Sequence, residues 1–326
     1  MSTAVIVDAV RTAGGRRNGK LSGWHPVDLA AEALKALAQR SDLDPALVDD
    51  VIMGCVMQVG AQGINVARNA VLAAGWPESV PGTTIDRQCG SSQQAVHFAA
   101  QGVMAGAYDV AVAAGVEVMS LVPMGASAMV AGIGVPFGPT VAARYAGVGG
   151  LVPQGISAEM IADRWGLTRT DLDEFGARSQ QLAERATAEG RFEREIMPVA
   201  ARIKDKETGK VTETGESVTS DEGIRPGTTV ETLANLKPAF KPDGKVTAGN
   251  SSQITDGASA VLIMSEERCA SLGLTPLARF HSFALAGVDP VTMLLGPIPA
   301  TRKVLERAKL SLDDIDLVEI NEAFAS

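Results

Sequence analysis

The sequence is poor in aromatic residues and in cysteine. Phe, Trp and Tyr make up 4% of the 326 residues, whereas 34 residues are glycine and 46% are hydrophobic. This composition predicts a folded α/β protein in which small side chains pack tightly, and it excludes a disordered chain. Cys55, Cys89 and Cys269 are too few and too scattered for a disulfide framework or a zinc site. We therefore predict a cytoplasmic protein without a metal.

Positive charge is also scarce. The chain has 29 Lys and Arg against 38 Asp and Glu, which gives a formal net charge of −9. Nucleic acids are bound by clustered Lys and Arg, and no such cluster is evident, so we expect no nucleic-acid partner. The N-terminus has no basic segment and meets a charge at Asp8, so no secretory signal is predicted.

A stretch without charged residues lies between Glu117 and Arg144. Pro123, Pro136, Pro139 and several glycines interrupt it, which is not the pattern of a membrane-spanning helix. We predict a buried, irregular insertion here and no membrane association.

Strand-like apolar runs and helical patterns alternate along the first part of the chain. Strands are predicted at 3–10, 48–56, 80–88 and 109–119, and helices from Pro26 onwards and at 65–74 and 91–106. Such alternation implies a parallel sheet with right-handed crossover connections.

The pattern changes between about residues 120 and 245. A Gly- and Pro-rich loop is followed by predicted helices at 157–165 and 170–190, and by a charged hairpin or loop at 204–220. Strands are predicted again at 258–264, 277–286 and 316–321, with a helix at 300–309.

An internal similarity links the two ends of the chain. Residues 43–54 align with 310–321 without a gap, with three identities and a shared apolar pattern. Any helix-to-strand unit resembles another, so both duplication and chance similarity remain open. If the duplication is real, the second copy is unfinished.

Cys89 lies where a predicted strand turns into a helix, within the polar segment 86–95. A helix N-terminus favours the thiolate form of a cysteine, and Gly90 permits a tight turn. An isolated cysteine is more often buried in a core, but the polar flanks of Cys89 argue against that alternative. For Cys55, inside an apolar run, the core alternative is preferred, whereas Cys269 is expected on a helix surface.

The segment Asp86-Arg-Gln-Cys-Gly-Ser-Ser-Gln-Gln-Ala95 resembles the active-site signature of thiolases, the family of acetyl-CoA acetyltransferases and 3-ketoacyl-CoA thiolases. Further motifs resemble that family in the same order along nearly the whole chain. They are Val10-Arg-Thr12, Gly115-Val-Glu-Val-Met-Ser120, Val246-Thr-Ala-Gly-Asn-Ser-Ser252 with Asp256-Gly-Ala258, and Asn321-Glu-Ala-Phe-Ala325.

The resemblance implies the thiolase fold, an α/β architecture with two duplicated mixed-sheet halves and a loop-domain insertion, the second half being incomplete. The expected domains are an N-terminal half at 1–119, a loop domain at 120–245, a return to the N-terminal half at 246–275 and a partial C-terminal half at 276–326. A homodimer or homotetramer is also implied.

The activity implied by the resemblance is reversible thiolytic cleavage or Claisen condensation of 3-ketoacyl-CoA and acyl-CoA, through an acyl group carried on Cys89. CoA is a substrate in this chemistry, and no other cofactor is implied. Asn321 matches the family asparagine that positions a water for an oxyanion hole. CoA contacts are expected at Arg225, Phe240, Ala248, Ser252 and Phe324. The signature and the Gly-rich segment 124–138 resemble degradative or steroid side-chain thiolases more than biosynthetic ones.

The chain departs from the family pattern in its acid–base residues. The family places these in Gly-His-Pro and Cys-x-Gly-Gly-Gly motifs, which do not occur here, and His25, His97 and His281 stand in other contexts. His281 falls in a predicted strand. Without a base for the α-proton, this chain alone is expected to accept an acyl group but not to form a carbon–carbon bond.

Two alternatives to a thiolase remain. One is a non-catalytic acyl-CoA or lipid-binding protein with the thiolase fold, although the retained Cys89 weighs against it. The other is a ketoacyl-synthase-like enzyme, which pairs its cysteine with two histidines or with a His and Asn set.

Overall fold

The computed structural model describes residues 2–326, which form two compact units. Unit 1 comprises the residues up to Gly132, Gly190–Gly223 and Ile254–Phe280. Unit 2 comprises Ile133–Glu189, Ile224–Gln253 and His281–Ser326.

Unit 1 is built on a mixed sheet. β3 is parallel to β4 and β5, whereas β8 is antiparallel to both β5 and β1. The predicted parallel sheet is therefore correct for β4, β3 and β5 and wrong for the rest. The short β2 pairs with β8, and the strand order of the sheet is β4 (Gly82–Ile85), β3 (Asp50–Gly54), β5 (Val110–Val118), β8 (Thr255–Ser265), β1 (Ala4–Arg11) and β9 (Ala278–Arg279), with β2 at Gly15–Arg16.

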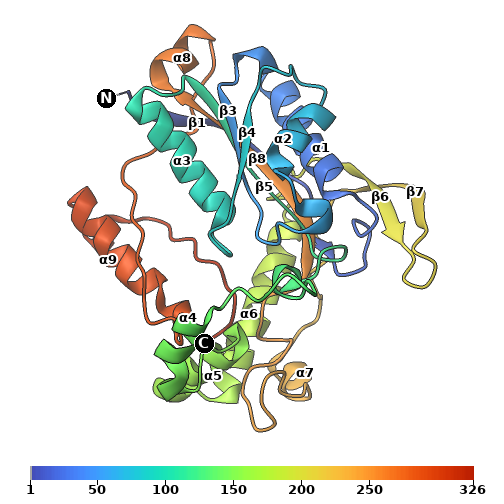
Figure 1. Ribbon diagram of the computed structural model, residues 1–326, viewed down its shortest axis with the longest axis vertical. Helices are drawn as coiled ribbons and strands as arrows, with labels where there is room; N and C mark the ends of the chain where they lie inside the picture. Colours follow the sequence, from blue (N-terminus) through green and yellow to red (C-terminus); the bar gives the residue numbers. More distant parts are fainter. Residues whose placement is uncertain (1) are drawn as a thin grey trace. The chain divides into compact units, whose positions relative to one another are not determined.

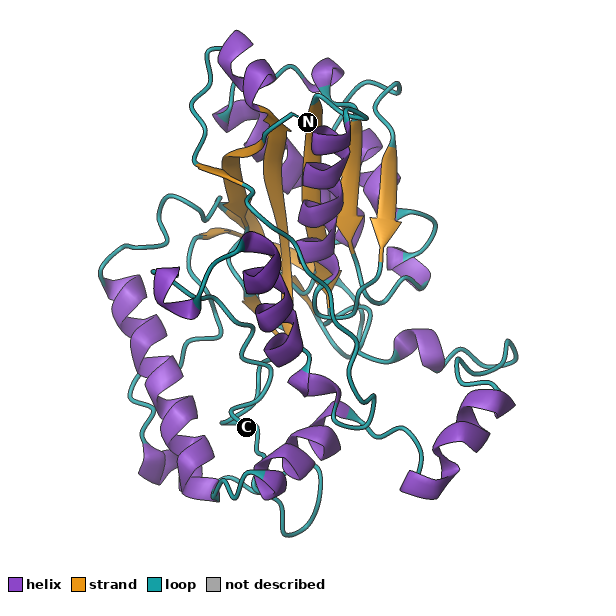
Figure 2. Ribbon diagram, turned by 90° about the vertical axis from the view of Figure 1, so that its left-hand side faces the viewer, coloured by secondary structure: helices purple, strands orange, loops and turns teal. Residues whose placement is uncertain are grey.

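Helices cover both faces of this sheet. Figure 1 shows α1 (Pro26–Arg40) and α2 (Val66–Ala73) on one face and α3 (Ser91–Ala105) on the other, and Figure 2 shows a helix running along the strands. The side chains of α3 that pack on the sheet are small and fully buried. They are Ala95, Ala99, Ala100 and Val103.

The remaining elements of unit 1 are a hairpin and a short helix. β6 (Val199–Lys204) and β7 (Val211–Val218) pair in antiparallel fashion, so the hairpin alternative for this charged region is correct. α8 (Glu266–Ser271) follows β8 and buries Cys269, which is 1% exposed. The prediction of a surface position for Cys269 is wrong, because the residues that follow α8 cover the thiol, which donates a hydrogen bond to the Leu274 carbonyl at 3.3 Å. Cys55 is buried, as predicted.

Unit 2 is mainly helical around a small core. Its helices are α4 (Pro139–Tyr145), α5 (Gln154–Arg164), α6 (Arg169–Ala188), α7 (Val230–Ala234) and α9 (Pro297–Ala308). The core contains Ala158, Ala162, Leu172 and Val246, with Leu294, Phe324 and Ala325 packed against it. Within residues 2–326, no helix combines the length and the apolar character needed to cross a membrane.

Three predictions for this part of the chain are wrong. Of the strand predicted at 277–286, only Ala278–Arg279 pairs, with two residues of β1, and His281 lies in a loop. Residues 316–321 form no strand in the described structure, because no neighbouring strand supplies hydrogen-bond partners, and Leu317 is 90% exposed. The charge-free stretch contains α4 and is largely exposed rather than buried.

The internal similarity has a structural counterpart. Pro45–Leu47 and Leu312–Asp314 are both one-turn 3-10 helices, and they occupy matching positions in the ungapped alignment. Each follows a helix, α1 in the first copy and α9 in the second. This agreement favours duplication over chance similarity.

Candidate active site

Cys89 lies in the turn that joins β4 to α3 in unit 1. The Asp86 carboxylate accepts a hydrogen bond from the Gln88 N–H at 2.7 Å. The buried Ser91 hydroxyl accepts one from the Arg87 N–H at 2.8 Å and donates one to the Gln88 carbonyl at 2.6 Å. These bonds hold Gln88 at a φ of 50°, a left-handed conformation that costs on the order of 1 kcal/mol and is often found at active sites. The turn presents Cys89, which is exposed.

The other two cysteines are unsuited to nucleophilic attack. Burial and the nearby Glu117 carboxylate raise the pKa of Cys55 to about 12. Burial also raises the pKa of the Cys269 thiol. Both thiols therefore stay neutral near pH 7, and the thiolate is the reactive form. Of the three cysteines, Cys89 alone is exposed.

A polar network supports the loop that follows β3. The Glu117 carboxylate accepts hydrogen bonds from the Val56 N–H at 2.8 Å, the Met57 N–H at 3.2 Å and the Gln62 side-chain amide at 2.6 Å. Gln62 is fully buried, and its carbonyl oxygen accepts a hydrogen bond from the Val118 N–H at 2.9 Å. This part of the Gly115–Ser120 motif therefore stabilises the loop.

Two other motifs of unit 1 also make structural contacts. Asp256 is buried and accepts hydrogen bonds from the Ser120 N–H at 2.8 Å and the Ser120 hydroxyl at 2.6 Å. Burial raises the pKa of the Asp256 carboxyl, and the bonds from Ser120 oppose that shift. Arg11 forms ion pairs with Glu195 at 2.8 Å and Asp221 at 2.7 Å, which hold residues 190–223 at the end of β1.

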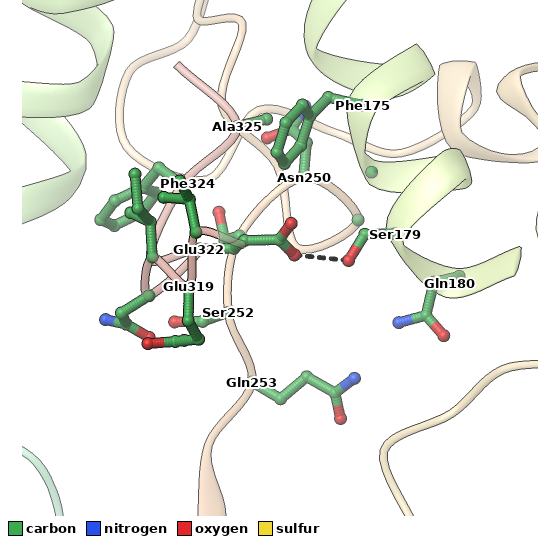
Figure 3. A pocket seen from close by; sticks show the side chains of 16 residues that line it. Phe175, Ser179, Gln180, Asn250, Ser252, Gln253, Glu319, Glu322, Phe324 and Ala325 are labelled. Atoms are coloured by element: carbon green, nitrogen blue, oxygen red, sulfur yellow. Dashed lines mark hydrogen bonds between the residues drawn. The ribbon is translucent and has the colours of Figure 1, made fainter. Parts of the chain in front are cut away.

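Unit 2 contains a pocket of about 820 Å³, which Figure 3 shows from close by. This volume is typical of small-molecule sites, which measure roughly 300–1,000 Å³. Its walls come from α6, from residues 249–253 and from residues 318–325. Three residues that the sequence predicts for the active site, Ser252, Asn321 and Phe324, line it together.

Backbone hydrogen bonds join two of these walls. The Ser252 N–H donates to the Ala323 carbonyl at 2.9 Å, and the Ala325 N–H donates to the Asn250 carbonyl at 3.0 Å. The segment that carries Asn321 is therefore fixed to the Thr-Ala-Gly-Asn loop.

A buried network of charged and polar side chains stabilises the Thr-Ala-Gly-Asn loop. The Asn250 side-chain amide donates to Asp173 at 2.9 Å, and Arg169 pairs with the other oxygen of Asp173 at 2.7 Å. The Asn250 side-chain oxygen accepts a hydrogen bond from the Thr247 N–H at 2.8 Å. Asp173 and Asn250 are 1% and 3% exposed, so these bonds are shielded from water.

The pocket also contains residues that the sequence prediction missed. The Ser179 hydroxyl donates a hydrogen bond of 2.6 Å to the Glu322 carboxylate, as the dashed line in Figure 3 shows. Phe175 and Gln180 line the same wall. The spacing of Phe175 and Ser179, four residues apart on a helix, places them on one face and could have indicated this surface.

The remaining predicted CoA contacts are not among the lining residues. The Phe240 ring meets the Phe324 ring edge-on, with 5.9 Å between centroids. Arg225 is exposed, and its N–H donates to the side chain of Gln180, a lining residue, at 2.8 Å. Ala248 is exposed in the Thr-Ala-Gly-Asn loop. Among residues 2–326 there is no group of three His, Cys, Asp or Glu side chains that could hold a metal ion.

Fold and site together define an α/β protein with an exposed cysteine at a strand-to-helix turn of unit 1 and a pocket in unit 2 that an asparagine lines. The family model described as "Thiolase, N-terminal domain" matches residues 4–267, and the one described as "Thiolase, C-terminal domain" matches residues 274–326. The chain belongs to the thiolase family.

Known proteins agree with this assignment. A 3-ketoacyl-CoA thiolase of Saccharophagus degradans is 50% identical over 325 residues, which cover 99% of this chain and 79% of the relative. The steroid 3-ketoacyl-CoA thiolase FadA6 of Mycobacterium tuberculosis is 47% identical, with 100% of this chain and 77% of the relative covered. The crystal structure of the Bacillus anthracis acetyl-CoA acetyltransferase matches with a TM-score of 0.85 and 40% identity, covering 100% of this chain and 81% of that one. The predicted thiolase fold is thus confirmed.

Proposed function

We propose that this chain provides the acyl-accepting cysteine of a degradative 3-ketoacyl-CoA thiolase, an acyltransferase that uses 3-ketoacyl-CoA and CoA as substrates. The observation that carries the proposal is the exposed Cys89 in a fixed strand-to-helix turn, inside a motif that resembles the thiolase signature. The names of the relatives, which include a steroid thiolase, support a degradative role on fatty acyl or steroid side-chain substrates.

In the cleavage direction, the Cys89 thiolate adds to the 3-keto carbon and forms an oxyanion. Collapse of this adduct breaks the bond between carbons 2 and 3, and the leaving enolate takes a proton from a general acid to become acetyl-CoA. The thiolase family places this acid–base group in its Gly-His-Pro and Cys-x-Gly-Gly-Gly motifs, which do not occur in this sequence. The shortened acyl group remains on the Cys89 sulfur as a thioester. The CoA thiol then gives its proton to the same acid–base group and attacks that thioester, which releases the shortened acyl-CoA and restores the thiolate. Asn321 is assigned to orient a hydrogen-bond donor toward an oxyanion.

CoA recognition is assigned to unit 2. The pocket combines the polar groups of Ser252 and Asn321 with the aromatic ring of Phe324, a mixture suited to the amide-bearing pantetheine arm. Phe240 packs against that ring, and Ala248 is exposed in the same loop as Ser252. The guanidinium of Arg225 is assigned to the phosphates of the nucleotide.

We also propose an oligomeric state and a cellular location for the protein. A homodimer or homotetramer would cover exposed apolar side chains such as Ile133, Val135 and Phe137. Light scattering after size-exclusion chromatography measures the oligomeric state directly. Three cysteines that form no disulfide among residues 2–326 suit the reducing cytoplasm.

Mass spectrometry of the acyl-enzyme tests the proposed function. The protein, expressed as its gene encodes it, is incubated with acetyl-CoA and digested, and an acetyl adduct is expected on the Cys89 peptide. Cys269→Ala is the matched control that keeps the adduct, and Cys89→Ser removes it. Binding of CoA without any adduct would instead support the non-catalytic alternative. Comparing straight-chain with steroid side-chain 3-ketoacyl-CoA as substrates then identifies the acyl specificity.

A further inference from the structure

The first turn of α3 rests on two glycines in neighbouring strands. Gly54 ends β3 and Gly115 lies in β5, and the parallel register pairs these two residues with each other. Together they form a patch of sheet without side chains, directly under the helix that follows Cys89. Neither glycine has a positive φ, so space rather than backbone conformation explains why glycine is needed at both positions.

The space above both glycines is already occupied. A Cβ atom on Gly54 would lie 2.3 Å from the Ser92 nitrogen and 2.4 Å from the Ser91 carbonyl carbon. A Cβ atom on Gly115 would lie 2.7 Å from the Ser92 Cβ and 3.1 Å from its hydroxyl oxygen. Each distance is too short for ordinary packing, so any side chain at either position must displace the first turn of α3.

Hydrogen bonds would transmit that displacement to the nucleophile Cys89. Ser91, the first residue of α3, is hydrogen-bonded through its hydroxyl to the backbone of Arg87 and Gln88, the two residues before Cys89. A shift of the first turn therefore moves the whole Cys89 turn relative to the strand ends. It also moves the helix N–H groups that favour a thiolate.

We propose that Gly54 and Gly115 are positioning residues that set how deeply the Cys89 turn is seated on the sheet. The inference rests on the proposed role of Cys89 as the nucleophile. On this proposal, the reactivity of Cys89 depends on two glycines that are distant from it in the sequence and take no part in the reaction themselves.

An added methyl group would clash with different atoms at the two glycines, and this difference makes the test specific. Gly54→Ala meets backbone atoms of α3, which no side-chain change can remove. Gly115→Ala meets the side chain of Ser92, which Ser92→Gly removes. Each alanine variant is expected to slow alkylation of Cys89 by iodoacetamide about tenfold or more, and to move its pH profile upward. Adding Ser92→Gly is expected to restore the Gly115→Ala variant but not the Gly54→Ala variant.

Gly102→Ala provides the matched control. Gly102 lies near the far end of α3, where a Cβ atom would come within 2.3 Å of the Tyr108 ring. This variant overpacks the same helix, so it is expected to lose stability while the alkylation rate of Cys89 stays unchanged. Circular dichroism verifies that each variant is folded at the assay temperature.

The outcomes separate this inference from the proposed function. Acylation of wild-type Cys89 by acetyl-CoA tests the proposed function, whereas the alkylation rates of the variants test whether Gly54 and Gly115 position the Cys89 turn. A folded Gly54→Ala or Gly115→Ala variant with the wild-type rate and pH profile would overturn the inference. If Gly54→Ala does not fold, the alkylation rates of Gly115→Ala with and without Ser92→Gly provide the test. Failure of Ser92→Gly to restore the rate would contradict the proposed contact between residue 115 and Ser92.

Discussion

Replacement of Glu117 by alanine tests whether the loop after β3 depends on one carboxylate. Glu117 accepts three hydrogen bonds, two of them from the backbone N–H groups of Val56 and Met57 and one from the buried Gln62. Removing the carboxylate leaves the two backbone N–H groups without their acceptor, whereas the Gln62 amide keeps the Met57 carbonyl, to which it donates at 3.1 Å. Glu117→Gln retains one acceptor oxygen but places an amide group among donors.

The expected loss follows from these contacts. A hydrogen bond to a charged group contributes about 1.5–3 kcal/mol, and bonds to one shared acceptor are not additive. Glu117 is partly exposed, so water can replace some of its interactions. We therefore expect the free energy of unfolding to fall by about 3–4 kcal/mol in Glu117→Ala and by about 1–2 kcal/mol in Glu117→Gln.

Urea denaturation followed by tryptophan fluorescence measures this loss. Trp24 and Trp76 are both buried in unit 1, so their emission reports on the unit that contains Glu117. Glu32→Ala is the control, because Glu32 makes only a surface ion pair with Lys35 on α1 and should contribute no more than about 0.5 kcal/mol. A Glu117→Ala protein as stable as the control would show that the three donors do not depend on the carboxylate, and would refute the reasoning.

Three further outcomes are expected. Because burial raises the folded-state pKa of Asp256 above its ordinary value of 3.8, its contribution to stability is complete below pH 3.8 and is lost as the pH rises through the folded-state pKa. Urea unfolding should therefore show wild type gaining stability relative to Asp256→Asn as the pH falls from about 7 to about 4, and an unchanged difference would contradict the raised pKa. Ellman's reagent at pH 7 should label Cys89 quickly and reach Cys55 and Cys269 only after unfolding, so a second fast thiol would be inconsistent with their burial. Asp173→Ala should cost about 2–3 kcal/mol in urea unfolding, because it removes a buried carboxylate that accepts from Asn250 and Arg169 while both donors keep backbone carbonyl acceptors, and a loss below about 1 kcal/mol would contradict this estimate.

The local structure around Cys89 could be predicted from the sequence because its determinants are local. A Thr-rich strand, a polar turn and a helix with small buried residues follow one another within 82–105, and hydrogen bonds between near neighbours complete the turn. The same holds for the Asn321–Ala325 segment only in part. Its motif indicates a site, but its position is set by Ser252, Asn250 and Ser179, which lie far away in the sequence.

The failed strand predictions have a common physical cause, since each strand depends on a pairing partner that the local pattern does not specify. The apolar run at 277–286 is a strand only where it meets β1, and the run at 316–321 has no strand beside it. The sequence pattern of β8 predicts one more strand of an alternating series, but β8 lies between β1 and β5 and is antiparallel to both. No sequence signal indicated the close approach of Ser92 to Gly54 and Gly115, because isolated glycines are common in strands, turns and loops alike.

The pairing of the first strand with the last long one has a consequence for synthesis on the ribosome. β1 pairs Ala4 with Ser265 on one side, and its other partner, β9, lies later still. At roughly 5–20 residues per second, the apolar β1 waits on the order of ten seconds or more before either partner leaves the exit tunnel. Nascent chains are thus exposed to aggregation during that interval, and chaperones that bind emerging apolar segments at the ribosome are expected to raise the yield of folded protein.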